Sequence, residues 1–228
     1  MRRGRERRVS GAFVAEGPRE VGRALAAGLR PLAMYHSPEL LPDWAHGGEE
    51  VTRRVLAKMS YRTEPEGVLA VFETPSAAMP ENATLVLVAV GIEKPGNLGA
   101  LARSAAASGA DALAVHGTGA DPWNPNAIRA STGAVFTLPV VTTTLAEIQE
   151  LPLRKVAAVV GAATRHTDAD LTPPTALLVG AEDDGLPEEW RAAADLEVAI
   201  PMHDRGVDSL NASAAAAVLL FEAVRQRG

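Results

Sequence analysis

The chain has 228 residues, enough for one large domain or two small ones, and only 4% of them are aromatic, so its core must be built mainly from aliphatic residues. It has no cysteine, which excludes disulfides, thiolate metal sites and a cysteine nucleophile and is typical of a cytoplasmic protein. No apolar run is long enough to span a bilayer, and the basic N-terminus lacks the apolar segment of a secretory signal.

The net charge of −6 is distributed unevenly. Residues 1–78 carry 12 Lys and Arg against 10 Asp and Glu, whereas residues 79–228 carry 10 against 18. Five arginines lie within the first eight positions: Arg2, Arg3, Arg5, Arg7 and Arg8. Such a cluster can neutralise the phosphates of a nucleic acid, although a solubilising tail has the same composition.

The first third of the chain predicts a small α/β unit. Residues 1–10 are expected to be mobile. Strands are expected at residues 13–16, 31–35 and 67–72, and helices at 18–27 and 51–60. Pro18 marks the start of the first helix and Gly28 its end. Because residues 74–82 are rich in proline and lack periodicity, we expect domains at 1–73 and 83–228 with a linker between them.

The second part begins with a continuous apolar run at residues 85–90, which is typical of a strand buried on both faces. Further strands are predicted at residues 112–115, 137–141, 156–160, 176–179 and 196–200. Helices are predicted at residues 100–108, 126–132, 145–150 and 187–194 and from 209 onward. This alternation favours a parallel sheet covered by helices on both faces.

Three loops follow strands of this sheet: residues 93–99, 180–186 and 201–208. Open α/β sheets bind ligands at the carboxyl ends of their strands, so the three loops together predict one shared site. In the first loop, glycines allow a ligand to approach the backbone, and Arg103 follows Gly99 by about one helical turn. The spacing is neither the dinucleotide fingerprint nor a phosphate-binding loop, and a plain tight turn remains an alternative.

The other two loops are also ambiguous when taken singly. The second contains three successive acids, Glu182 to Asp184, but not the alternating pattern of a calcium loop, so a solvated turn is the simpler interpretation. In the third, Ser209 and Asn211 lie where a helix is expected to begin, and helix caps alone would explain them. The five histidines show no ligand spacing, and we therefore expect no metal.

Three motifs occur in order: N-L-G-x-x-x-R at residues 97–103, G-x-E-x-x-G-L at 180–186 and I-P-M…D-S-L-N-x-S at 200–213. They resemble the motifs of the SpoU/TrmH-type RNA 2′-O-ribose methyltransferases of the SPOUT superfamily. The resemblance covers residues 84–225. Residues 13–71 look like the small L30e-like substrate-binding domain that precedes many of these enzymes.

The resemblance implies an α/β fold: a parallel-sheet SPOUT domain with a C-terminal trefoil knot, behind the L30e-like domain. It also implies a homodimer and the cofactor S-adenosylmethionine. Gly180, Ile200 and Leu210 match the cofactor contacts. The polar positions around the transfer point are matched by Asn97, Arg103, Glu182, Ser209 and Asn211. The chain departs from many members at Ala181 and Asp183 and in a longer loop at residues 203–208.

The resemblance implies a central catalytic role for Arg103, in some members as a base. Because an arginine stays protonated in proteins, we favour Arg103 as a clamp on a phosphate that also stabilises the developing alkoxide. Asn97 and Asn211 would orient the ribose, Ser209 would fix the loop or bind the hydroxyl, and Glu182 would steady Arg103 or the sulfonium. RNA is expected to contact the first domain through its arginine cluster. Further basic candidates there are Arg53, Arg54, Lys58 and Arg62.

Ribosomal RNA is the expected substrate, with transfer RNA as the alternative. Two other classes stay open: a nucleotide-cofactor enzyme on a conventional doubly wound sheet, and a non-catalytic RNA-binding protein of the same fold. The absent dinucleotide fingerprint disfavours the first. The joint presence of Asn97, Arg103, Glu182, Ser209 and Asn211 disfavours the second.

Overall fold

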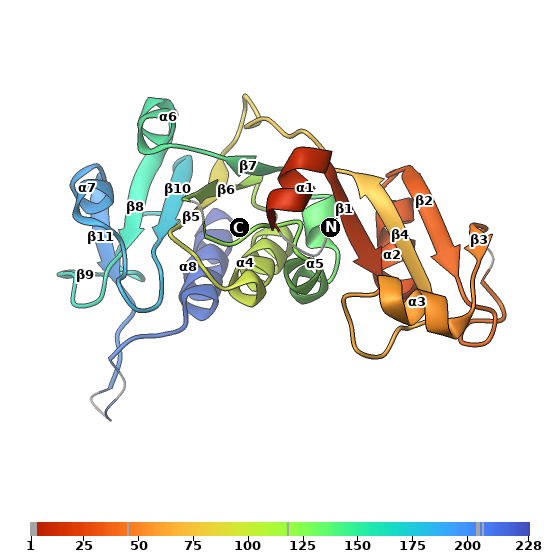
Figure 1. Cartoon of the computed structure of the whole chain (residues 1–228). Coiled ribbons are helices and arrows are strands. Elements are labelled where there is room, and N and C mark those ends of the chain that lie inside the picture. The colour runs from red at the N-terminus through yellow and green to blue at the C-terminus, as the bar shows by residue number, and fades with distance from the viewer. Residues whose placement is uncertain (1–3, 45, 118, 204–205, 207) are drawn as a thin grey trace.

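The computed structural model of the chain describes residues 4–44, 46–117, 119–203, 206 and 208–228. It contains a four-stranded and a seven-stranded sheet, which lie side by side in Figure 1. Arg2 and Arg3, expected to bind RNA, lie outside the described residues, as does part of the 203–208 loop. Among the helices described, none is long and apolar enough to cross a membrane.

The smaller sheet has the order β1-β4-β2-β3. Its strands are β1 (Ala12–Glu16), β2 (Pro31–His36), β3 (Glu49–Glu50) and β4 (Val68–Glu73). β1 and β2 run antiparallel to β4, and β3 runs parallel to β2. The accompanying helices are α1 (Gly4–Ser10), α2 (Pro18–Ala26) and α3 (Arg53–Met59). We refer to residues 4–73 of this part as the front unit.

The larger sheet has the order β7-β6-β5-β10-β8-β11-β9, and every pairing in it is parallel. Its strands are β5 (Leu85–Val90), β6 (Ala112–His116), β7 (Val140–Thr142), β8 (Arg154–Ala158), β9 (Thr164–Arg165), β10 (Thr175–Val179) and β11 (Leu196–Ala199). The helices are α4 (Pro95–Ala107), α5 (Pro125–Ser131), the 3₁₀ turn η1 (Ala134–Phe136), α6 (Leu145–Glu150), α7 (Glu188–Ala192) and α8 (Ala212–Arg227).

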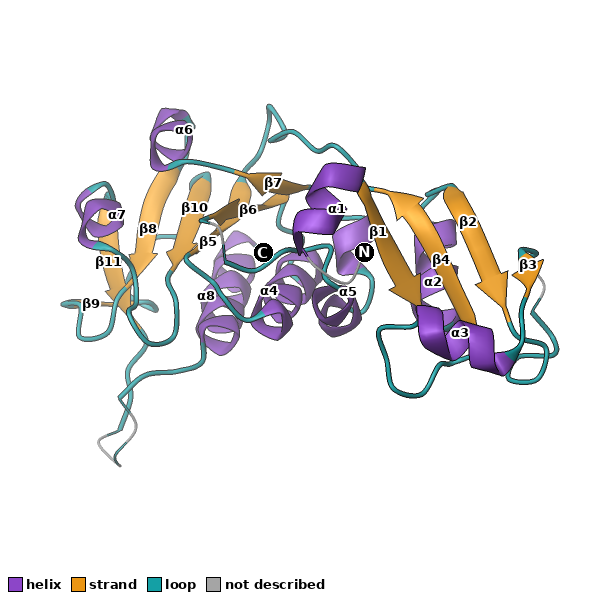
Figure 2. Cartoon of the chain, in the orientation of Figure 1, coloured by secondary structure: helices purple, strands orange, loops and turns teal. Residues whose placement is uncertain are grey.

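Helices cover both faces of the larger sheet, as Figure 2 shows. Alternate residues of β5 point to opposite faces, as the pleat of a strand requires. Leu87 packs in the core that holds α4 and α8, whereas Val88 packs in the core that holds Ile148 of α6 and Trp190 of α7. The predicted parallel sheet, buried on both sides, is therefore confirmed.

A single apolar core joins the two sheets. Phe13 of β1 stacks on Phe72 of β4 with ring centroids 5.5 Å apart. It also lies 4.8 Å from the ring of Trp123 and 5.8 Å from that of Phe136, both in the part of the chain that carries the larger sheet. All three aromatic contacts lie at distances favoured by such rings. The front unit is thus docked by apolar packing.

Several predicted boundaries were wrong, including that of the strand expected at residues 137–141, which spans only Val140–Thr142. Residues 4–10 form helix α1 with Arg7 buried, although this segment was expected to be mobile. Helix α4 begins at Pro95, so residues 95–99 are helical and do not form a loop; proline is favoured at the first helical position. Helix α8 begins only at Ala212, capped by Asn211, because the polar loop continues through Leu210.

Candidate functional site

A cavity of about 400 Å³ opens at the carboxyl ends of β8, β10 and β11. Its wall is formed by the segments that follow these strands, residues 158–160 and 180–186 together with Ile200, Met202 and residues 208–210, and by the start of α8. Five of the predicted site residues line it: Gly180, Glu182, Ile200, Ser209 and Leu210. Two of the three loops, far apart in sequence, therefore meet at one cavity.

The loop after β10 folds back on itself over Gly180. A Cβ atom at this position would collide with the backbone of Gly185 and Leu186, so only glycine fits there. A bridge between Ala181 and Gly185 closes the loop, and Gly185 has a φ of 67°, which favours glycine. Gly180 thus contributes to the cavity by letting the loop close as well as by lining it.

A polar network beside the cavity connects the starts of α4 and α8 with the loop after β10. The carboxylate of Glu182 accepts from the ammonium of Lys94 at 2.8 Å and from the side-chain amide of Asn211. The same Asn211 amide nitrogen lies 3.3 Å from the Oδ1 atom of Asn97. Residues from all three motifs are therefore joined, although Asn97 and Asn211 do not line the cavity itself.

The orientation of the Asn211 amide follows from its other contacts. Its Oδ1 atom accepts from the backbone N–H of Ser213 at 2.9 Å and of Ala214 at 3.4 Å, which caps the first turn of α8. The amide nitrogen is then left to donate to Asn97 and Glu182. One side chain thus begins the helix and holds the two other motifs together.

The site carries negative charge. The hydrogen bond from Lys94 is the largest cause that holds the pKa of Glu182 below its usual value, and the contacts with Asn97 and Asn211 act in the same direction. Glu182 in turn raises the pKa of Lys94. Both groups are therefore charged at neutral pH, and three further carboxylates line the cavity: Asp183, Asp184 and Asp208.

Arg103 is exposed on α4 and does not line the cavity. It lies six residues after Asn97, about 9 Å along the helix axis. No hydrogen bond or ion pair links it to another residue in the part of the chain that the structure describes. Its guanidinium is therefore available to a ligand that reaches the site from the solvent.

The predicted RNA-binding arginines differ in their surroundings. Arg7 is 3% exposed and pairs with Asp121 at 2.7 Å across the contact between the two sheets, so its guanidinium is occupied within the protein. Arg53 pairs with Glu64 at 3.2 Å but remains exposed. Arg5, Arg8 and Arg54 are exposed.

Lys94, which contacts Glu182 and precedes the first turn of α4, is a site residue that the three motifs do not indicate. Its position next to Pro95, which marks a helix start, was the available signal. Within the described residues, no cluster of three or more His, Cys, Asp or Glu side chains could hold a metal ion.

Known proteins resemble this chain over most of its length. A family model described as the SpoU rRNA Methylase family matches residues 84–221, and one described as the MRM3-like substrate binding domain matches residues 1–70. A 23S rRNA (uridine(2479)-2′-O)-methyltransferase of Streptomyces viridochromogenes is 34% identical over 97% of this chain and 85% of its own length. The 23S rRNA (guanosine-2′-O-)-methyltransferase RlmB of Vibrio parahaemolyticus is 35% identical over 82% and 75%.

Solved structures resemble the whole chain. A crystal structure of an RNA 2′-O ribose methyltransferase is 40% identical, with a TM-score of 0.84 over 99% of this chain and 92% of the other. The SpoU methyltransferase AviRb of Streptomyces viridochromogenes, in complex with AdoMet, is 31% identical with a TM-score of 0.88 over 99% and 94%. Sequence and structure therefore agree: the chain belongs to the SpoU rRNA methylase family.

Proposed function

We propose that the protein transfers a methyl group from S-adenosylmethionine to a ribose 2′-hydroxyl of ribosomal RNA. The observation that carries the proposal is the cavity whose wall includes Glu182. This carboxylate accepts hydrogen bonds from Asn211 and Lys94, so the cavity adjoins the starts of α8 and α4. The names of the relatives support the reaction and the class of RNA.

The cavity has the size and chemistry that S-adenosylmethionine requires. About 400 Å³ lies within the usual range for small-molecule sites. Val179, Ile200 and Leu210 supply apolar wall for an adenosine, and carboxylates at the rim attract a cationic sulfonium. When bound, the cofactor supplies an electrophilic methyl group, so that an oxygen–carbon bond forms as a sulfur–carbon bond breaks and the hydroxyl proton passes to solvent.

The protein's own groups would position the RNA. Arg103 would clamp a phosphate beside the reacting ribose and stabilise negative charge that develops on its oxygen, since a guanidinium is a poor base but a strong donor. Asn97 and Asn211, held by Glu182, would orient the ribose. Ser209 at the rim of the cavity would bind the hydroxyl or fix the loop.

The front unit would hold the rest of the RNA through exposed arginines, of which Arg5, Arg8, Arg53 and Arg54 are candidates. We further propose the domain division at residues 1–73 and 83–228 and a C-terminal trefoil knot. A homodimer is also proposed. It is supported by the exposed apolar side chains of Val218 (38%) and Phe221 (49%) on α8, which light scattering with a Phe221→Glu variant would test.

The test is methyl transfer in vitro. Purified protein is incubated with methyl-labelled S-adenosylmethionine and, in parallel, with unmodified 23S ribosomal RNA, 16S ribosomal RNA or transfer RNA. We expect label in one ribosomal RNA, released by alkaline hydrolysis as a dinucleotide because a 2′-O-methyl group blocks cleavage. Label in transfer RNA alone would contradict the choice of RNA, and label on bases would contradict the reaction.

A further inference from the structure

Helix α5 lies between the front unit and helix α4, which carries Asn97 and Arg103 (Figure 1). It contacts β1 on one side and α4 on the other. A small cleft between the parts is lined by Val14 and Tyr61 of the front unit and by Ile128 and Arg129 of α5. We therefore expect a movement of the front unit relative to the site to act on α5.

The contact between α5 and α4 is tight at Gly99. A Cβ atom there would collide with the carbonyl of Ala127, the side chain of Ala130 and the amide of Ser131. The two helix backbones therefore touch, with no flexible side chain between them to absorb a shift. Gly99 lies two residues after Asn97 and four before Arg103, so the position of α5 determines that of both.

The C-terminal end of α5 has an unusual backbone. Thr132 has a φ of 52°, and among the described residues no other non-glycine residue has a positive φ. A β-branched residue in this region is strained, and such strain persists only where the surroundings enforce it. Gly133 follows with a φ of 87°, and the buried hydroxyl of Ser131 accepts from its amide at 3.2 Å and donates to the carbonyl of Ile128 at 2.7 Å.

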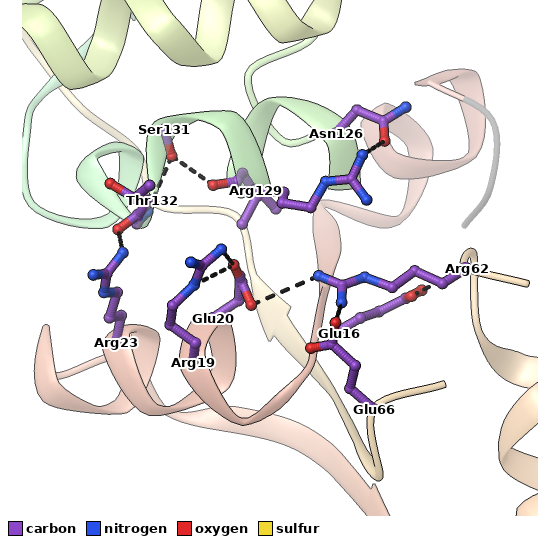
Figure 3. Close-up of polar contacts among 12 residues, drawn as sticks. Glu16, Arg19, Glu20, Arg23, Arg62, Glu66, Asn126, Arg129, Ser131 and Thr132 are labelled. Atoms are coloured by element: carbon purple, nitrogen blue, oxygen red, sulfur yellow. Dashed lines mark hydrogen bonds and ion pairs between the residues drawn. The ribbon is translucent and has the colours of Figure 1, made fainter. Parts of the chain in front are cut away.

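One side chain of the front unit reaches this turn. The guanidinium of Arg23, on α2, donates to the carbonyl of Thr132, as Figure 3 shows. Its aliphatic carbons lie over Gly133, where any Cβ atom would meet them. A cation at the end of a helix also interacts favourably with the free carbonyls there. Arg19, one turn earlier on α2, instead pairs with Glu20 of its own helix at 2.7 Å.

We propose that Arg23 is a positioning residue for helix α4. Through its contacts with Thr132 and Gly133, Arg23 fixes the position of α5. The close contact at Gly99 then lets α5 fix the position of α4 and of its residues Asn97 and Arg103. The front unit thereby takes part in aligning the site as well as in holding RNA. The kinetic consequence rests on the methyltransferase function proposed above, whereas the mechanical coupling does not.

The experiment compares Arg23→Met, Arg23→Lys and the matched control Arg19→Met in the full-length protein. All three keep a long side chain on the same helix, and only the first removes a donor that reaches α5. Two readouts are used: kcat and KM for RNA, and hydrogen exchange of peptides from residues 95–107 and 125–138. Exchange reports the coupling without any enzymatic turnover.

We expect Arg23→Met to lower kcat about tenfold, which corresponds to roughly 1.4 kcal/mol. KM for RNA should stay within about twofold of wild type, because the front unit keeps its surface arginines. Exchange should rise at the end of α5 and in the first turns of α4. Arg23→Lys should restore most of the rate, since an ammonium can donate to the same carbonyl, and Arg19→Met should behave as wild type.

Unchanged exchange in α4 and α5 of Arg23→Met would overturn the coupling, whether or not the wild-type protein methylates RNA. A defect confined to KM would overturn it as well, since Arg23 would then act as an RNA contact. If the wild-type protein does not methylate RNA but hydrogen exchange in α4 and α5 is faster in Arg23→Met than in wild type, the proposed methyltransferase function would be refuted and the coupling would stand. If Arg23→Met does not fold, Arg23→Ala against Arg19→Ala gives the same comparison, because alanine also removes the donor and is favoured in a helix.

Discussion

Replacing Gly99 by alanine tests how closely helix α4 packs on helix α5. The new methyl group would meet the Ala127 carbonyl, which belongs to a helix backbone and cannot rotate away. Gly96 offers a matched control three residues earlier on the same helix, because a Cβ atom there has nothing within 4 Å. Both substitutions replace a helical glycine and differ mainly in the collision.

The expected difference in the free energy of unfolding between the two variants follows from two opposing effects. Alanine is favoured over glycine in a helix by up to about 1 kcal/mol, a gain that largely cancels between the two variants. Overpacking a close contact costs about 1–3 kcal/mol. We therefore expect the free energy of unfolding of Gly99→Ala to lie about 1–3 kcal/mol below that of Gly96→Ala. For a chain of this size each kcal/mol changes Tm by roughly 2–4 °C.

Urea denaturation followed by circular dichroism measures both variants, with calorimetric Tm values as a check. Methyl transfer by Gly99→Ala should also fall, because α4 moves away from α5 and takes Arg103 with it. If Gly99→Ala proved as stable as Gly96→Ala, the helices would not be in backbone contact and the reasoning would fail.

Three further outcomes are expected. Arg103→Ala should abolish methyl transfer and leave the calorimetric affinity for S-adenosylmethionine nearly unchanged, because Arg103 does not line the cavity; a joint fall in both would contradict this division. Replacing Arg5 and Arg8 by glutamine should weaken RNA binding and reduce the slope of log affinity against log salt concentration by about 0.7–0.9 for each phosphate that is no longer neutralised. An unaltered slope would remove Arg5 and Arg8 from the interface. Arg7→Gln should instead lower Tm, since Arg7 pairs with Asp121. Arg225 and Gln226 lower the pKa of Glu222 to about 2 in the folded protein. The contribution of Glu222 to stability should therefore be full above about pH 5 and should disappear as the pH falls towards 2. Glu222→Gln should flatten this pH dependence of stability, and acid unfolding curves identical to those of the wild type would exclude the contribution.

The periodicity of the sequence predicted the larger sheet because local pattern and burial agree there. The apolar run at residues 85–90 reads as a strand covered on both sides, and its alternate residues do enter two different cores. Pro18 likewise began its helix at the expected position. In each case the signal is carried by neighbours in the chain.

Features that depend on distant contacts could not be predicted in this way. Nothing local shows that Phe13 packs on Trp123, or that Arg7 is used to dock the front unit and not to bind RNA. Gly99 looked like a loop glycine, and only the position of α5 shows that it serves helix packing. The strain at Thr132 has no signature in composition or spacing, because tertiary contacts enforce it.

The central claim is that the cavity closed over Gly180 holds S-adenosylmethionine beside Glu182. A calorimetric titration of the cofactor into wild-type protein and into Gly180→Val tests it most directly, with circular dichroism to show that both are folded. We expect one binding site per chain in the wild type and none in the variant, because a side chain at position 180 would force the loop open. Equal binding by a folded Gly180→Val protein, or no binding by the wild type, would contradict it.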